Sequence, residues 1–133
     1  MFQKIGLVLL LSISLVTTAH AQSLDGTYRG RITFIKDVEL LPGADRCTAS
    51  ETIEFRIIGS TIETKPAGFA QVLVAPLAAD GSFRITGQRP SRSPTHPIVA
   101  EYTGTVKNSR IEGTSRGQGP GRVCDFTFSA RKR

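Results

Sequence analysis

The stretch "TYRGRITF", residues 27–34, gives the clearest indication of the fold class, because inward-type and polar residues alternate along it. Successive side chains of a β-strand point to opposite faces of the sheet, so a period of two places one set toward a core and the other toward water. The alternation therefore predicts a strand with one buried and one solvated face. The inward set is Tyr28, Gly30, Ile32 and Phe34, and the outward set is Thr27, Arg29, Arg31 and Thr33.

The same alternation recurs along the rest of the chain, and no window between the runs has a helical period. It is found in "ETIEFRII", "SFRITG", "PIVAEYTGTV", "SRIEGTS" and "RVCDFTFSA", and residues 61–65 and 71–75 form two shorter runs. The chain is therefore expected to form about eight strands. The aromatic residues predicted to point inward are Tyr28, Phe34, Phe55, Phe83, Tyr102, Phe126 and Phe128.

Turn-forming pairs separate these runs and predict antiparallel hairpins. Gly59-Ser60, Asp80-Gly81 and Asn108-Ser109 each contain a residue that tolerates a positive φ angle. Many short strands joined in this way favour an all-β fold, a single small antiparallel meander closed into a barrel, with a β-sandwich as the alternative. In such a barrel the last strand pairs with the first, which removes the exposed edges of an open sheet.

The N-terminal segment has the pattern of a secretory signal peptide. Lys4 precedes an apolar run that ends at Val16, and Ala19 and Ala21 supply the small residues of a cleavage site. The run is shorter than the ~20 residues of a membrane-spanning helix, and no later segment is apolar enough to span a membrane. The sequence therefore predicts a signal peptide, residues 1–21, and one β-barrel domain, residues 22–133, in a periplasmic or secreted protein.

The chain has two cysteines, Cys47 and Cys124, far apart in the sequence. In an exported protein such a pair predicts one disulfide, and both cysteines share the parity of inward-pointing residues. A zinc site needs about four ligands at short spacing. Because His96 is the single histidine after residue 21, neither a metal site nor another cofactor is predicted.

The stretch "DGTYRG", residues 25–30, resembles the opening strand of small secreted β-barrels of the calycin type, the avidin-like and lipocalin-like proteins. It is also similar to uncharacterised secreted proteins of alphaproteobacteria, which share this opening and a late cysteine-containing strand such as "RVCDFTFSARK". The resemblance implies a barrel fold. Those families usually have tryptophan where this chain has Tyr28, and this chain contains no tryptophan, so no binding residues are carried over.

Basic residues gather in two stretches rich in proline or glycine. Without Lys4 the chain has 16 basic and 11 acidic residues, a net charge of +5, which favours an anionic partner. Nucleic acid is not expected as a partner of an exported protein. Residues 87–97 and 113–122 are predicted to be long loops at the barrel rim, either plain connectors or an anion-binding surface. Their candidate binding residues are Arg89, Arg92, His96, Arg116 and Arg122.

The barrel interior is a second candidate site. An eight-stranded barrel is just wide enough to be filled by side chains or to hold one small ligand. The hydroxyl groups of Tyr28 and Tyr102 could contact such a ligand, although buried tyrosines more often bond within the core. The sequence favours a filled interior, but several inward glycines leave space.

Two functions remain open from the sequence. The first is an exported non-enzymatic binding module that uses the rim loops or a small cavity to bind an anionic envelope component, a small molecule or another exported protein. The second is a periplasmic hydrolase with a carboxylate pair. It receives less support, because the chain has no G-x-S-x-G nucleophile motif and because Glu54, Glu101 and Glu112 are predicted on the solvated face. No catalytic residue is assigned.

Overall fold

The computed structural model describes residues 23–44, 46–47, 51–91 and 96–133, and the predicted signal peptide lies outside these ranges. Among the described residues there are eight β-strands and no helix, as expected from the alternating pattern. The strands are β1 (Gly26–Glu39), β2 (Glu51–Ile58), β3 (Thr61–Thr64), β4 (Leu73–Pro76), β5 (Ser82–Arg89), β6 (Ile98–Lys107), β7 (Arg110–Gly119) and β8 (Arg122–Lys132).

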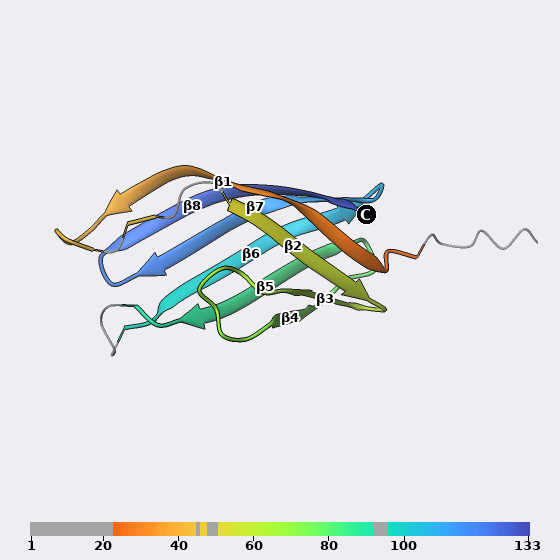
Figure 1. Cartoon of the computed structure of the whole chain (residues 1–133), viewed down its shortest axis with the longest axis horizontal. Coiled ribbons are helices and arrows are strands. Elements are labelled where there is room, and N and C mark those ends of the chain that lie inside the picture. Colours follow the sequence, from red (N-terminus) through yellow and green to blue (C-terminus); the bar gives the residue numbers. More distant parts are fainter. Residues whose placement is uncertain (1–22, 45, 48–50, 92–95) are drawn as a thin grey trace, which may run out of the picture.

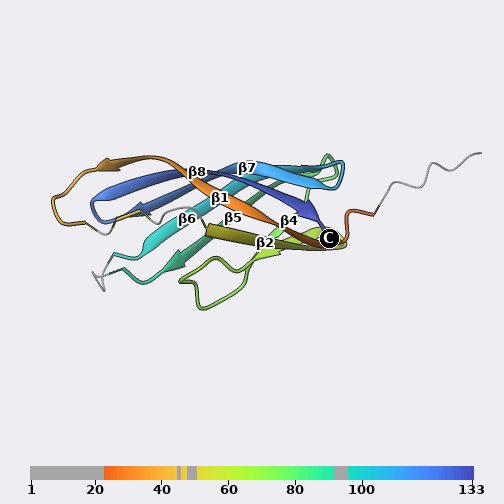
Figure 2. The same ribbon diagram turned by 45° about the horizontal axis from the view of Figure 1, so that its top comes forward.

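All eight strands belong to one antiparallel sheet with the order β4-β3-β2-β1-β8-β7-β6-β5. The sheet curls until its two end strands face each other, which produces a nearly closed barrel (Figures 1 and 2). The first and last strands pair along most of their length, as predicted, through a register that runs from Tyr28 opposite Lys132 to Glu39 opposite Arg122.

The barrel closes incompletely between β4 and β5, so the expectation that closure removes every sheet edge is wrong. The two strands are joined by one isolated bridge between Leu77 and Phe83. β4 has four residues and ends at Pro76, which has no N–H group to donate to a neighbour. Side chains close this seam instead, because Leu73 fills the space above Gly87 where a Cβ atom would lie.

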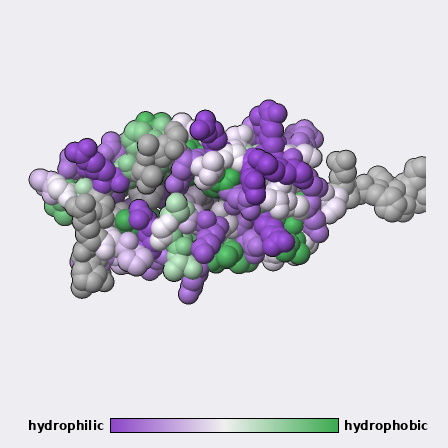
Figure 3. All heavy atoms as spheres, in the orientation of Figure 1, coloured by the Kyte–Doolittle hydropathy of each residue, from purple (hydrophilic) through white to green (hydrophobic). Residues whose placement is uncertain are grey.

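Aromatic and branched side chains fill most of the interior. Phe55 and Phe128 lie with their ring centroids 5.2 Å apart, and Phe83 and Tyr102 complete the cluster. Removing one such side chain from water contributes about 2 kcal/mol to the free energy of folding. Outward positions are mainly polar, and Figure 3 shows hydrophilic side chains over most of one face, with apolar ones in small groups.

A β-bulge in β1 changes which side chains face inward. The register with β8 shifts between Phe34 and Lys36, so that Ile35 is the extra residue. Beyond the bulge, Asp37 lies opposite the inward-facing Cys124, and Glu39 lies opposite Arg122. Phe34 lies opposite Phe126, on the predicted inward face, but it is 37 % exposed beside this irregularity.

The predicted turns are present, but one predicted loop is not a loop. Gly59, Gly81, Asn108 and Ser109 all have positive φ angles, which tight hairpins require. The glycine-rich residues 113–122 instead form most of β7, a short turn and the start of β8. Residues 87–89 likewise belong to β5 rather than to the following connector. Glycines at inward positions of β7 allow the sheet to curve closely around the core, because the Phe128 ring lies where a Gly113 side chain would stand.

The predicted disulfide joins Cys47 to Cys124, with Cα atoms 5.8 Å apart. It ties the connection between β1 and β2 to the beginning of β8. Both half-cystines line the same cavity in the barrel. Cys124 has the predicted inward parity in β8, whereas Cys47 lies before β2. The bridge therefore holds one wall of that cavity in place.

Candidate functional site

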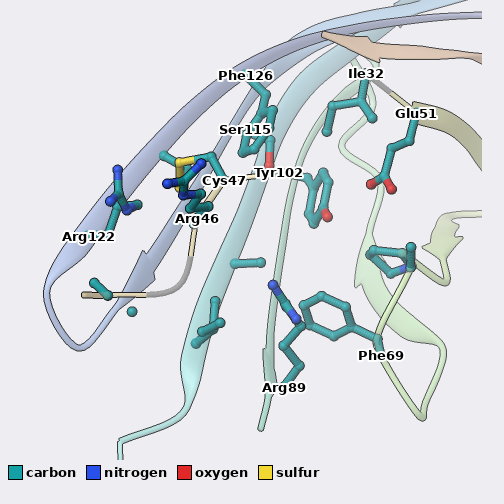
Figure 4. Close-up of a pocket in the computed structure, with 18 of the residues that line it drawn as sticks. Ile32, Arg46, Cys47, Glu51, Phe69, Arg89, Tyr102, Ser115, Arg122 and Phe126 are labelled. Atoms are coloured by element: carbon teal, nitrogen blue, oxygen red, sulfur yellow. A yellow bond between two sulfur atoms is a disulfide. The ribbon is translucent and has the colours of Figure 1, made fainter. Parts of the chain in front are cut away.

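A cavity of about 90 Å³ lies at the end of the barrel where β5 and β7 end and where β2, β6 and β8 begin. Tyr102 of the aromatic cluster lines it, and Figure 4 shows the labelled side chains converging from several strands. Its walls combine apolar side chains with a small number of polar ones. The lining includes Ile32, Arg46, Glu51, Phe69, Arg89, Ile98, Ala100, Tyr102, Ser115, Gly117, Arg122 and Phe126.

Strand parity explains why polar groups point into this end of the barrel. Glu51 is the first residue of β2 and has the inward parity of Ile53 and Phe55. Arg89 is the last residue of β5 and has the inward parity of Ile85. Inward-facing charges are tolerated at strand ends, where the barrel opens to water, and would be costly at its centre.

Two hydroxyl groups line the same cavity as these charges. Tyr102 and Ser115 are directly opposite each other in the pairing of β6 with β7, and both are buried. Burial, with a smaller contribution from the negative charge of Glu51, raises the pKa of Tyr102 to about 12, although a hydrogen bond with Ser115 and the charge of Arg89 oppose the shift. Tyr102 therefore keeps its proton at neutral pH and presents a hydroxyl group to the cavity.

Glu51 and Arg89 are half-buried groups of opposite charge in the same cavity. Burial raises the pKa of the Glu51 carboxyl group, and the charge of Arg89 opposes this effect. The Arg89 guanidinium packs against Gly68, 3.3 Å from where a Cβ atom would stand. In Figure 4, Glu51, Tyr102 and Arg89 all point into the open space.

Arg122 lines the cavity beside the disulfide, but its charge is already neutralised. Its side chain is 13 % exposed, and its guanidinium forms ion pairs with Asp37 and with Glu39, the latter at 3.3 Å. Its Nε atom is buried without a hydrogen-bond partner in the described structure. This cluster was missed from the sequence, because the bulge at Ile35 turns Asp37 and Glu39 inward.

The other predicted binding residues do not gather at the cavity. Arg116 points outward and bonds both oxygens of Asp125, at 2.7 and 3.2 Å. The Tyr28 hydroxyl donates to the carbonyl oxygen of Leu24 at 2.7 Å, so Tyr28 is a core residue. His96 is exposed, and its carbonyl oxygen accepts a bond from Ser91 at 2.5 Å. Arg92 lies outside the described residues.

The structure thus brings Arg89, Tyr102 and Arg122 of the predicted set into one cavity and adds Arg46, Glu51 and Ser115. The signal for Glu51 was present in the sequence as inward parity at a strand end, and that for Ser115 as inward parity within a strand. Arg46 had no such signal, because it lies in a connection between strands.

The Arg116–Asp125 pair gives a testable pH dependence. Hydrogen bonding to Arg116 is the main cause that lowers the pKa of Asp125. The stabilisation is present above about pH 4, the range of an unfolded aspartate, and is lost as the pH falls through the lowered folded value. We expect Asp125→Asn to reduce the free energy of unfolding at pH 6, and the difference from wild type to narrow at pH 2.5. Urea unfolding at both pH values measures this, and an equal difference at both would contradict it.

Three further carboxylates on the strands form ion pairs on the outer surface. Glu54 pairs with Arg29, Glu101 with Arg84 at 2.8 Å and Glu112 with Arg110 at 3.2 Å, which confirms their predicted outward placement. Among the described residues, no group of three histidines, cysteines or carboxylates is placed to hold a metal ion. Within the same ranges, no helix is long and apolar enough to cross a membrane.

Together these features define an eight-stranded antiparallel barrel, stapled by one disulfide, with a small cavity of mixed polarity at one end. A comparison with protein-family models, curated proteins and solved structures found no match for the chain.

Proposed function

We propose that the protein is an exported, non-enzymatic binding protein that holds a small ligand in the cavity at the end of its barrel. The observation that carries this proposal is the convergence of Arg89, Glu51, Tyr102 and Ser115 on one hollow between apolar walls. Binding sites for small molecules are typically apolar hollows with a few convergent polar groups that orient the ligand. The disulfide and the signal-peptide pattern support export to an oxidising compartment.

The size of the cavity limits the ligand. A cavity of about 90 Å³ has room for about six water molecules, at roughly 15 Å³ each. The ligand or ligand fragment that replaces them is therefore small, with on the order of ten non-hydrogen atoms or fewer.

The cavity supports the proposal better than the predicted rim surface does. Arg116 is already paired on the outer face of β7, and Arg122 is paired inside the barrel. Their charges are therefore not available together to an anionic polymer or protein. A hydrolase receives no support from this geometry, because Glu51 is the single carboxylate among the described lining residues, whereas glycoside hydrolysis generally uses two.

Filling the cavity with a side chain tests the proposal. Gly117 lines the cavity, and a Cβ atom placed there meets nothing within 4 Å. We expect Gly117→Leu to fold as well as wild type, because glycine inside a strand costs about 0.5–1 kcal/mol, and to occupy the space of the ligand. Native mass spectrometry of protein purified from the periplasm should show a bound small molecule on wild type and none on this variant.

Gln118→Leu is the matched control, since its side chain is the next along β7 and faces outward. It should retain the same bound molecule as wild type. A ligand that remains on the Gly117→Leu variant would place binding elsewhere, and wild-type protein without any retained small molecule would refute the proposed function.

A further inference from the structure

We infer that the ligand is a small zwitterion with an aliphatic body, whose carboxylate faces Arg89 and whose ammonium group faces Glu51. This inference rests on the proposed function, and it is carried by two half-buried charges of opposite sign in one small cavity. Free aliphatic amino acids are the simplest members of this ligand class.

The two charges select against ligands with a single charge. A monoanion that approached Arg89 would also lie near the Glu51 carboxylate, which would repel it. A monocation near Glu51 would be repelled by the positive charge of Arg89 and by that of Arg46 at the mouth of the cavity. Either ligand would desolvate one protein charge without pairing it, which is costly in a confined site. A zwitterion compensates both charges.

Ion pairs elsewhere do not satisfy these two groups. In the described ranges, no ion pair involves Glu51 or Arg89, whereas Arg122 is held by Asp37 and Glu39. Glu51 and Arg89 interact through the cavity and both influence Tyr102. The protonated Tyr102 hydroxyl responds to both charges, and Ser115 lies opposite Tyr102 in the same cavity lining. Both hydroxyl groups can donate to a carboxylate or accept from an ammonium group.

The rest of the lining indicates the body of the ligand. Ile32 lies opposite Glu51 in the pairing of β1 with β2, and Ile98 lies opposite Arg89 in the pairing of β5 with β6, so apolar wall adjoins each of the two charges. Ala100 and Phe126 extend this apolar lining. Burial of apolar ligand surface against such a wall is favourable. The cavity is too small for a large aromatic body in addition to both charged groups, so a branched aliphatic chain fits it best.

Isothermal titration calorimetry at pH 7 and low ionic strength tests the inference with three matched probes. L-Leucine carries both charges, 4-methylpentanoate lacks its ammonium group, and 3-methylbutylamine lacks its carboxylate. We expect wild type to bind leucine about tenfold more tightly than either analogue, since one compensated charge is worth about 1.4 kcal/mol or more.

Single substitutions should change these preferences in opposite directions. Glu51→Gln is expected to weaken leucine binding about tenfold and to strengthen 4-methylpentanoate binding, because the repelling carboxylate is gone. Arg89→Gln should weaken leucine binding and strengthen binding of the amine. Glu54→Gln is the control, because Glu54 lies in the same strand, faces outward and pairs with Arg29; it should leave all three affinities unchanged.

The outcomes separate this inference from the proposed function. Equal affinities of wild type for leucine and 4-methylpentanoate would overturn the inference that the ligand is a zwitterion. A Glu51→Gln variant whose affinities for both probes fall equally would also overturn it. Neither result would contradict the proposal that the cavity binds a small ligand. If none of the three probes binds, while wild type still retains a molecule of another class and Gly117→Leu loses it, the zwitterion inference is overturned and the proposed function stands. A result that contradicts the proposed function itself would appear instead in the native mass spectra described above.

Discussion

Replacing Cys47 and Cys124 together by serine is expected to lower the free energy of unfolding by about 4 kcal/mol, because the disulfide closes a long loop that restricts the unfolded chain. The two cysteines are 77 positions apart and link the β1–β2 connection to β8. This loss is a large share of the free energy of unfolding of a small domain, which is roughly 5–15 kcal/mol. Urea unfolding followed by far-ultraviolet circular dichroism measures it.

Reduction of the wild-type protein provides the control for this prediction. A phosphine reductant should lower the unfolding free energy of wild type to that of the double serine variant, and it should leave the variant itself unchanged. A double variant within about 1 kcal/mol of wild type would show that the bridge constrains little, since long loops are predicted to gain the most from closure.

Replacing Gly30 by alanine is expected to cost about 3 kcal/mol, at the upper end of typical overpacking effects. A methyl group at Gly30 would overlap the carbonyl oxygen of Ser129 and lie 2.6 Å from the Cα atom of Ala130. These are backbone atoms of β8, so they cannot rotate away as a side chain would. The substitution must push apart β1 and β8, the two strands whose pairing brings the chain ends together in the barrel.

Gly117→Ala is the matched control for this substitution. Gly117 is also an inward glycine in a strand, but a Cβ atom there meets nothing within 4 Å. The variant should be as stable as wild type or more stable by up to about 1 kcal/mol. Thermal unfolding of both variants side by side measures the contrast. Equal melting temperatures for the two would contradict the tight approach of β1 to β8.

The strand pattern could be predicted from the sequence because a period of two is a local property. Tyr28, Phe55, Ile57, Ile85 and Phe128 are all nearly inaccessible to water, as their alternation required. The turns at Gly59, Gly81 and Asn108 were equally predictable, since the needed positive φ angles restrict the residue type. Antiparallel neighbours then follow from short connections, and the pairing of the first with the last strand follows from curling the sheet into a barrel.

Features that depend on the whole sheet could not be predicted in this way. A bulge inserts one residue and reverses the parity of everything beyond it, so Asp37 and Glu39 carried no local sign that they face Arg122. The composition of residues 113–119 resembles a loop, yet glycine suits this strand because Phe128 occupies the space inside it. The open seam at β4 depends on a strand too short to pair fully with β5.

The candidate site also combines residues that the sequence could identify with residues that it could not. Arg89 was singled out as a basic residue near prolines, and it lies in the cavity because its position at the end of β5 has inward parity. Arg116 was singled out as a basic residue in a glycine-rich stretch, but it has outward parity and pairs with Asp125. Charge alone therefore did not identify the site, whereas charge combined with parity at a strand end would have identified Arg89 and Glu51 together.

A crystal structure of the protein purified from the periplasm without added ligands tests the central claim most directly. We predict difference density for a small molecule in the cavity, within hydrogen-bonding distance of Arg89, Glu51 and Tyr102 and absent from crystals of Gly117→Leu. A cavity that contains ordered water alone, while a copurified molecule is bound on the outer surface, would contradict the account.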